Sequence, residues 1–267
     1  MTSVVAYSTL VLGAMGLALG LLLAISSRVF AVKLDPRIEE VTAALAGLNC
    51  GVCGYPGCAA LAEAIVAGRA KAKQCPPGGA SAVRKVAAIL GREAVFAEPS
   101  VAAVRCRGGK SAAKEKAVYR GIRDCVSAEL LGAGPKACVY GCLGMGSCVD
   151  VCPFGAIRMD AENLPEVIEG KCTACGMCVA VCPRHIIALI PIPQKVYVGC
   201  VSRDRGKRVK DVCAAGCTAC GLCAGLKITP SGKVVIKDNL PEFPPDWEDF
   251  KTAAGKCPSH CFVMRKA

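Results

Sequence analysis

Two closely spaced cysteine runs between residues 138 and 182 constrain the fold of this chain more than any other feature. The runs are Cys138-x3-Cys142-x5-Cys148-x3-Cys152-Pro153 and Cys172-x2-Cys175-x2-Cys178-x3-Cys182-Pro183. In the second run, three thiolates on one short loop can bind three corners of an iron–sulfur cube, while the fourth reaches the cube of the other run. The proline after it ends the loop, because its ring fixes φ. The sequence therefore predicts an electron-transfer protein that carries 4Fe–4S clusters.

Disulfides and zinc are the alternatives to iron–sulfur ligation. The chain has 21 cysteines among 267 residues but only 4% aromatic residues, so something besides an ordinary core must stabilise its soluble part. Disulfides would do this in a short secreted chain. The x2 spacings, the Cys-Pro pairs and the lack of a cleavable export signal favour metal ligation instead. Zinc sites are typically built from two C-x2-C pairs, which is not the pattern here.

An uncharged N-terminal segment predicts a membrane anchor. Residues 1–27 carry no charged side chain, and the apolar run from Val4 to Ile25 is long enough to cross a hydrocarbon core of about 30 Å. A signal peptide would need a positive n-region and a cleavage site, and a buried core helix would not need this uninterrupted length. The cations Arg28, Lys33 and Arg37 follow the run and none precedes it. We therefore expect a single-pass protein of a prokaryotic inner membrane, with its N-terminus outside and its iron–sulfur domains in the cytoplasm.

A separate cysteine group lies between this anchor and the central runs. Its members are Cys50-x2-Cys53-x4-Cys58-x16-Cys75. Glycines at 51, 54 and 57 let the backbone curl tightly around a cofactor. We predict that these four thiolates bind one 4Fe–4S cluster, with a helix over residues 59–67 that leads from the third ligand towards the fourth.

The flanks of this group predict two more helices. Pro36 is well placed to begin the first. Residues 81–91 predict the second, with Ser81 as its N-cap and Gly91 beyond its end. Residues 92–100 are the expected linker to the next domain.

Crossed pairing assigns the ligands of the central runs. One cube takes Cys152, Cys172, Cys175 and Cys178. The other takes Cys182 with Cys142 and Cys148, but position 145, where its next thiolate is expected, is methionine. We expect Cys138 to supply the missing ligand if its loop folds back.

An internal repeat extends the pattern towards the C-terminus. The spacing Cys138-x3-Cys142-x5-Cys148 returns as Cys213-x3-Cys217-x5-Cys223, and Cys220 is present in the second copy. We predict a cube on Cys217, Cys220, Cys223 and Cys257. A fifth cube on Cys106, Cys125, Cys200 and Cys213 would satisfy the repeat, while the alternative is that some of these are buried free thiols. Cys261 is left unassigned. The sequence thus predicts at least three cubes, and four or five with the C-terminal repeat.

The net charge of +12 concerns partners and membrane rather than fold. No helix-turn-helix, finger or RNA-binding pattern accompanies it, so we expect no nucleic-acid partner. The basic run over residues 203–210 is expected on a loop, either as a solvated turn or as a docking patch for an acidic redox partner. His185 and His260 each follow a Cys-Pro pair and could hydrogen-bond a cluster or serve only at the surface. No G-x-G-x-x-G after a strand and no phosphate-binding loop pattern is present, so no NAD, flavin or nucleotide site is expected.

Several motifs together resemble the B subunit of the Rnf complex, in its longer form. They are the N-terminal membrane helix, then DPR, NCGVCGYPGC, CPPGG, VRCRGGK, GIRDC, KACVYGCLGMGSCVDVCPFGAI and KCTACGMCVAVCP. The resemblance covers essentially the whole chain. It departs at the C-terminus, where Lys227 stands in place of a fourth-position cysteine and the last ligand pair is reduced to CPSHC.

The resemblance implies a polyferredoxin subunit of an ion-translocating ferredoxin:NAD+ oxidoreductase. Such a subunit accepts electrons from soluble acidic ferredoxin and passes them to other membrane and peripheral subunits, which translocate Na+ or H+ and reach NAD+. Two alternatives remain. The module at residues 50–75 also resembles the iron–sulfur domain of corrinoid methyl-transfer proteins and some redox sensors, which would make the chain a reductive activator or a sensor scaffold. The chain could also serve another membrane oxidoreductase such as a hydrogenase.

The expected fold class is α+β, with ferredoxin-like βαβ pseudo-repeats after the small helical domain. The expected domains are an anchor at 1–27, a four-cysteine domain at 34–91, a linker at 92–100, a two-cluster domain at 101–197 and a degenerate repeat at 198–267.

Overall fold

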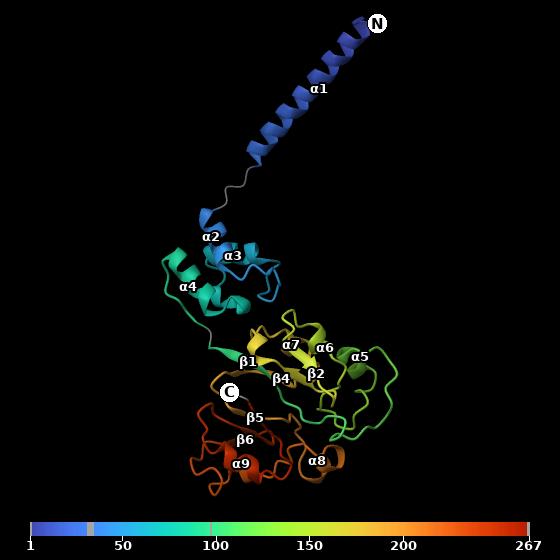
Figure 1. The fold of residues 1–267 in the computed structure, drawn as a ribbon, viewed down its shortest axis with the longest axis vertical. Coiled ribbons are helices and arrows are strands. Elements are labelled where there is room, and N and C mark those ends of the chain that lie inside the picture. The colour runs from blue at the N-terminus through green and yellow to red at the C-terminus, as the bar shows by residue number, and fades with distance from the viewer. Residues whose placement is uncertain (1, 31–34, 97, 266–267) are drawn as a thin grey trace.

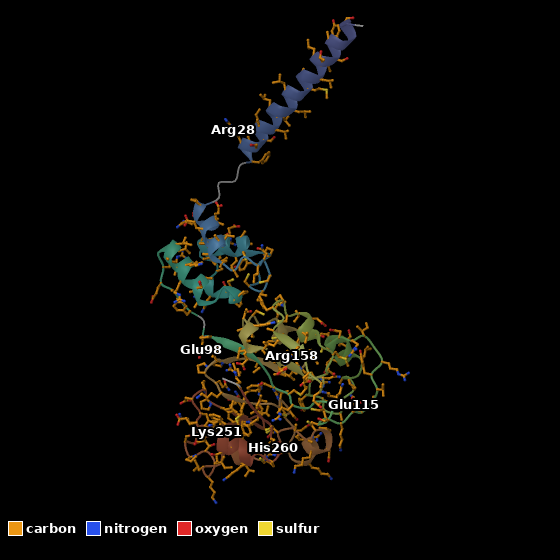
Figure 2. All side chains as sticks on the ribbon, in the orientation of Figure 1. Arg28, Glu98, Glu115, Arg158, Lys251 and His260 are labelled. Carbon is orange, nitrogen blue, oxygen red and sulfur yellow. The ribbon has the colours of Figure 1, made fainter. Side chains whose placement is uncertain are left out.

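The computed structural model of the chain describes residues 2–30, 35–96 and 98–265. A long N-terminal helix, α1 (Thr2–Val29), projects away from the rest of the molecule (Figure 1). Residues Ala6–Val29 of this helix are long and apolar enough to cross a membrane, with a mean hydropathy of 2.2, and none of this stretch is buried. Arg28 lies at the end of α1 that faces the other domains (Figure 2). Lys33, also part of the orientation argument, lies outside the described residues.

Three helices form the small domain that follows. They are α2 (Pro36–Ala44), α3 (Cys58–Val66) and α4 (Gly79–Leu90), with short 3-10 turns at Ala72–Gln74 and Pro76–Gly78 between the last two. Pro36 begins α2 as predicted, and the Asp35 carboxylate caps it by accepting from Arg37 N at 3.0 Å. Gly91 ends α4 in the left-handed conformation, at φ 60°. Helix α4 begins before Ser81, so that residue is not its N-cap as expected.

The core of this domain is aliphatic and contains cysteine. Val41, Leu61 and Ile65 are almost fully buried. The side chains of Cys58 and Cys75 belong to the same cluster of buried residues. The four-cysteine loop is therefore continuous with the helix packing.

The central domain combines two antiparallel strand pairs with short helices. Strand β1 (Ser100–Val104) pairs with β4 (Ile187–Pro191), and β2 (Ile157–Met159) pairs with β3 (Pro165–Val167). The helices are α5 (Cys125–Leu130), α6 (Ser147–Asp150) and α7 (Met177–Val181), with a 3-10 turn at Glu169–Lys171. Helix α6 precedes β2, and α7 precedes β4.

The C-terminal domain repeats this order. Strand β5 (Val196–Val198) pairs with β8 (Phe262–Met264), and β6 (Val235–Lys237) pairs with β7 (Leu240–Glu242). Its helices are α8 (Lys207–Val212) and α9 (Phe250–Lys256), with a 3-10 turn at Leu222–Ala224. Its core contains a stacked ring pair, Phe243 and Trp247, whose centroids lie 4.4 Å apart. Residues 203–206 of the basic run lie on the expected loop, whereas residues 207–210 belong to α8.

Both domains thus have an outer strand pair that encloses a hairpin. Every strand pair among the described residues is antiparallel and every sheet has two strands. Such small sheets bury little surface by themselves, so the loops and short helices must supply most of each core.

Two arginines join the central and C-terminal domains. Arg265 forms an ion pair with Glu169 at 2.6 Å and donates to the carbonyls of Ile192 and Gln194. Arg107 donates to the carbonyls of His260 and Phe262, at the start of the last strand. The two domains lie side by side as a result (Figure 1).

Replacement of Arg265 by Met should loosen this junction. The Arg265 side chain is only 10% exposed, and its loss leaves the half-buried carbonyls of Pro191 and Gln194 without this donor, at a cost of about 1 kcal/mol. We expect faster hydrogen exchange of the β5 and β8 amides in the anaerobically purified full-length protein, measured by mass spectrometry. Arg158→Met is the control, because its ion pair with Glu166 is exposed on both sides and is worth at most about 1 kcal/mol. Equal exchange in the two variants would contradict the junction role.

Candidate iron–sulfur sites

The N-terminal group of cysteines surrounds the start of α3. Cys58 is the first residue of the helix and is buried, and its backbone N donates to Asn49 Oδ1 at 2.8 Å. Cys75 is also buried, whereas Cys50 and Cys53 lie half-buried on the preceding loop. Gly51 and Gly54 hold φ of 70° and 84°, which is the conformational freedom expected of them. Asn49, which fixes this loop to the helix, was not identified from the sequence.

One cavity of about 320 Å³ is bounded by the cysteines of the first predicted central cube. They are Cys152, Cys172, Cys175 and Cys178. Two sulfurs accept backbone hydrogen bonds there, Cys152 from Ala156 N at 3.3 Å and Cys172 from Ala102 N at 3.5 Å. The predicted grouping of these four residues agrees with their placement.

A second cavity, of about 390 Å³, is lined by cysteines that differ in one member from the predicted grouping. The cysteines that line it are Cys125, Cys142, Cys148 and Cys182. Cys138, which we expected here, lines a different cavity, and Cys125 takes its place. The loop after Cys142 turns through Gly144 and Gly146, at φ 77° and 91°, and passes Met145 without offering a thiol.

A polar network holds Cys125 at this second cavity. Its backbone N donates to Ser147 Oγ at 2.8 Å, and that hydroxyl donates to Asp124 at 2.9 Å. Asp124 also caps α5 by accepting from Ser127 N. Asp124 therefore supports the site although it was not predicted to do so; the pair Asp124-Cys125 within the motif GIRDC was a visible signal.

A third cavity, of about 410 Å³, lies in the C-terminal domain. It is lined by Cys217, Cys220, Cys223, Cys257 and Cys261. The first four are the predicted ligands. Cys261 is the fifth, and its sulfur lies 3.6 Å from that of Cys257.

The repeats of the chain separate the roles of Cys257 and Cys261. Cys257 precedes a proline, as Cys152 and Cys182 do, whereas Cys261 occupies the position of Ala156 and Ile186 in the corresponding turns. Those two residues are buried core side chains. A hydrogen bond from the Cys261 thiol lowers the pKa of Cys257 to about 5. Hydrogen bonds to Cys217 and then to Cys257 raise the pKa of Cys261.

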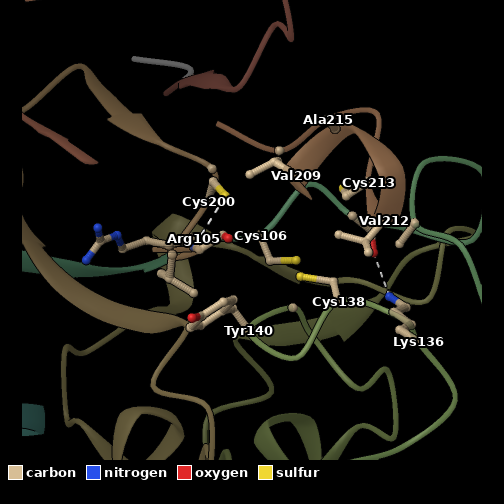
Figure 3. A pocket seen from close by; sticks show the side chains of 17 residues that line it. Arg105, Cys106, Lys136, Cys138, Tyr140, Cys200, Val209, Val212, Cys213 and Ala215 are labelled. Carbon is tan, nitrogen blue, oxygen red and sulfur yellow. Dashed lines mark hydrogen bonds between the residues drawn. The ribbon is translucent and has the colours of Figure 1, made fainter. Parts of the chain in front are cut away.

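A fourth cavity, of about 430 Å³, lies between the central and C-terminal domains. Figure 3 shows the sulfurs of Cys106 and Cys138 directed towards the same space, with Cys200 and Cys213 across it. Three of these residues are those of the predicted fifth cube. Cys138 replaces Cys125 in it, so the structure exchanges these two residues between the predicted groups.

Each of the four cavities is lined by at least four cysteines, which come from separate segments of the chain. Within residues 2–30, 35–96 and 98–265, no group of three or more His, Cys, Asp or Glu side chains is close enough to hold one metal ion. Zinc would require its thiolates about 2.3 Å from one centre. A 4Fe–4S cube instead binds each thiolate at a separate corner, so its four thiolates need not converge on one point.

Several of these thiols are protonated without metal. Burial raises the pKa of both Cys142 and Cys148 to about 12. Because iron binds the thiolate, cluster assembly must release these protons.

The two histidines occupy turn positions, and their side chains do not line the four cavities described above. His185 and His260 have φ of 49° and 45°, and Gly155 holds the corresponding position at 56°. The backbone N of each histidine donates to the carbonyl of the preceding cysteine at 3.1 Å, and both side chains are exposed. Both exposed side chains are consistent with the surface role expected as the alternative to a hydrogen bond to a cluster.

Comparisons with known proteins identify iron–sulfur domains in the chain. Residues 45–77 match the FeS family model, which describes an Fe-S cluster, and residues 137–186 match a 4Fe-4S dicluster domain. The chain therefore carries 4Fe–4S clusters, as predicted.

Relatives with similar sequences are named as components of ion-translocating complexes. The chain is 40% identical to the B subunit of the ion-translocating oxidoreductase complex of Methanosarcina acetivorans, over 98% of its own length and 97% of that protein. It is 47% identical to the B subunit of the Na+-translocating ferredoxin:NAD+ oxidoreductase complex of Acetobacterium woodii, over 76% of this chain but only 61% of that protein. It is 42% identical to the proton-translocating counterpart of Clostridium ljungdahlii, over 75% of this chain and 71% of that protein.

Double variants can test the exchange of Cys125 and Cys138. If Cys125 and Cys142 bind one cube, Cys125→Ser and Cys142→Ser should each lose about four irons, and the double variant should lose no more than either. If Cys138 binds a separate cube at the fourth cavity, Cys125→Ser combined with Cys138→Ser should lose about eight irons, because two cubes are then affected. Iron and sulfide are measured on anaerobically purified protein.

Cys261→Ala is the matched control for these variants. It removes a buried thiol beside a site and places there the residue found at position 156, so the iron content should not change. Loss of iron from Cys261→Ala, or additive loss from the Cys125 and Cys142 pair, would contradict these assignments.

Proposed function

We propose that this chain, which belongs to the family of B subunits of ion-translocating oxidoreductase complexes, carries electrons from reduced ferredoxin into such a complex. The observation that carries this proposal is the arrangement of thiols in the domains after the anchor. Three cavities within the central and C-terminal domains are each bounded by at least four cysteines. When bound, 4Fe–4S clusters accept and donate single electrons at low potential, commonly near −400 mV.

We infer four ligand sets for these clusters. They are Cys50, Cys53, Cys58 and Cys75; Cys152, Cys172, Cys175 and Cys178; Cys125, Cys142, Cys148 and Cys182; and Cys217, Cys220, Cys223 and Cys257. The protein contribution to each is a shaped cavity and backbone donors that orient the sulfurs. The central and C-terminal domains are then two ferredoxin-like units in which the second copy has lost part of its cysteine pattern.

We also infer the placement of the chain at the membrane. Helix α1 would anchor it, and Arg28 and Arg37 on the side of the large domains support a cytoplasmic location for them. The other membrane and peripheral subunits would translocate Na+ or H+ and perform the NAD+ chemistry, since no nicotinamide or flavin motif is visible in this sequence.

The exposed basic surface of α8 is the proposed docking site for ferredoxin. Lys207, Arg208 and Lys210 are exposed on this helix, while Val209 between them is buried against the cavity that separates the two domains. Ferredoxin is acidic, so this basic surface would attract it. Ferredoxin docked on α8 would lie close to the buried thiols behind the helix. If α8 were only a solvated helix, its charges would have no such effect.

Charge reversal on α8 should slow electron entry. We expect Lys207→Glu, Arg208→Glu and Lys210→Glu together to lower the rate of reduction by reduced ferredoxin at least about tenfold at low salt and to flatten its salt dependence. Stopped-flow absorbance of the full-length protein in detergent measures this rate.

The control has the same charge change elsewhere on the C-terminal domain. Lys227→Glu, Lys251→Glu and Lys256→Glu alter exposed residues away from α8. Equal slowing in both triple variants would refute α8 as the docking site. Failure of reduced wild-type protein to show any 4Fe–4S EPR signal, or the binding of zinc alone, would refute the electron-transfer function itself.

A further inference from the structure

The cavity between the central and C-terminal domains is not part of the ligand sets above. Its four cysteines come from distant parts of the chain, Cys106 and Cys138 from the central domain and Cys200 and Cys213 from the C-terminal one. The matched dicluster model begins at residue 137 and ends at residue 186, so it does not cover Cys106, Cys200 or Cys213.

Two glycines of this cavity lie against its sulfurs, where a side chain would crowd them. A Cβ added at Gly108 would lie 3.2 Å from the Cys213 sulfur, and one at Gly141 would lie 3.4 Å from the Cys138 sulfur. Two of the sulfurs already accept backbone hydrogen bonds, Cys106 from Cys142 N at 3.3 Å and Cys200 from Ser202 N at 3.4 Å. These are the same kind of contacts that Cys152 and Cys172 receive at their own cavity.

A buried cation is the second, independent observation. Lys136 lines the cavity and is only 4% exposed, and its Nζ donates to the Gly108 carbonyl at 2.6 Å (Figure 3). In the part of the chain that the structure describes, no ion pair includes Lys136. A buried charge is costly unless an opposite charge compensates it. Four thiolates around a 4Fe–4S core carry a net negative charge and would supply that compensation.

We propose that Cys106, Cys138, Cys200 and Cys213 bind a further 4Fe–4S cluster, with the ammonium group of Lys136 as its buried counter-charge. This inference rests on the proposed iron–sulfur function of the other sites. It accounts for 20 of the 21 cysteines and leaves only Cys261 outside a ligand set.

The position of this site gives it a connecting role. Cys106 accepts a hydrogen bond from the backbone of Cys142, a ligand of the second central set. Cys200 belongs to the same buried cluster as Cys217, a ligand of the C-terminal set. The site is thus in direct contact with one ligand set in each domain, and one electron taken from either neighbour can pass to the other without bond making or breaking. Val209 and Val212 of α8 and the adjacent Cys213 line this cavity, whereas the cations of α8 are exposed to solvent.

The first test counts clusters in full-length protein purified without oxygen in detergent. Iron analysis and Mössbauer spectroscopy should give about twenty irons in the wild type, all of the 4Fe–4S type. Cys106→Ser and Cys213→Ser should each lose about four irons, and the double variant should lose no more. A wild type with about sixteen irons, in which both serine variants retain them all, would overturn this inference and leave the proposed function intact. A wild type without any 4Fe–4S signal would overturn both.

The second test concerns Lys136 and keeps every ligand in place. Lys136→Met should retain the irons and shift one midpoint potential to a lower value in an EPR-monitored titration, because a positive charge next to the cluster favours its reduced form. Lys116→Met is the matched control, since that lysine also donates to a glycine carbonyl, that of Gly132, but is exposed. An unchanged set of midpoints in Lys136→Met, or the same shift in Lys116→Met, would contradict the counter-charge role.

Discussion

The contact between cysteine sulfur and the backbone that surrounds it is the interaction on which the rest of this structure depends. Cysteines belong to the buried clusters of all three domains that follow the anchor. Among the described residues the sheets have two strands each, and only the C-terminal domain has a stacked group of rings. A bound metal cofactor stabilises cores as small as these. The unfolded chain has no preformed site, so the free energy of cofactor binding adds to the stability of the folded state. The cavities therefore serve the fold as well as electron transfer.

A repeated turn directs the thiols inward. The loops after Cys172 and Cys217 pass through Ala174 and Ala219, both at φ 54°, and then through Gly176 and Gly221. Holding alanine in the left-handed region costs about 1 kcal/mol or more. The same positive φ occurs at equivalent positions in both domains, so the strained conformation is a property of this type of loop. In this conformation successive backbone N–H groups can point towards the sulfurs, which is how hydrogen bonds tune such clusters.

The sequence allowed prediction of what depends on local spacing. The helix after Cys58, the anchor and the grouping of Cys152 with Cys172, Cys175 and Cys178 all follow from patterns within a short stretch or from one known crossing rule. The exchange of Cys125 and Cys138 could not be predicted in this way. It depends on where a long loop returns, and that is set by the buried Arg184, whose guanidinium donates to the carbonyls of Cys138 and Gly141 and pairs with Glu129 on α5. Sequence spacing does not predict these contacts, because Arg184 lies far along the chain from the residues that it binds.

Met145 shows why the irregular first run still fits the repeat. It occupies the position that Cys175 and Cys220 hold in the other two loops, between glycine residues that keep the same turn. The turn is thus retained, while Cys125, held by Asp124 and Ser147, lines the cavity with Cys142 and Cys148. Ser147 stands directly before Cys148, so a residue of the first run itself positions Cys125. In our proposal Cys125 replaces the missing ligand, and Cys138 is free to face the C-terminal domain.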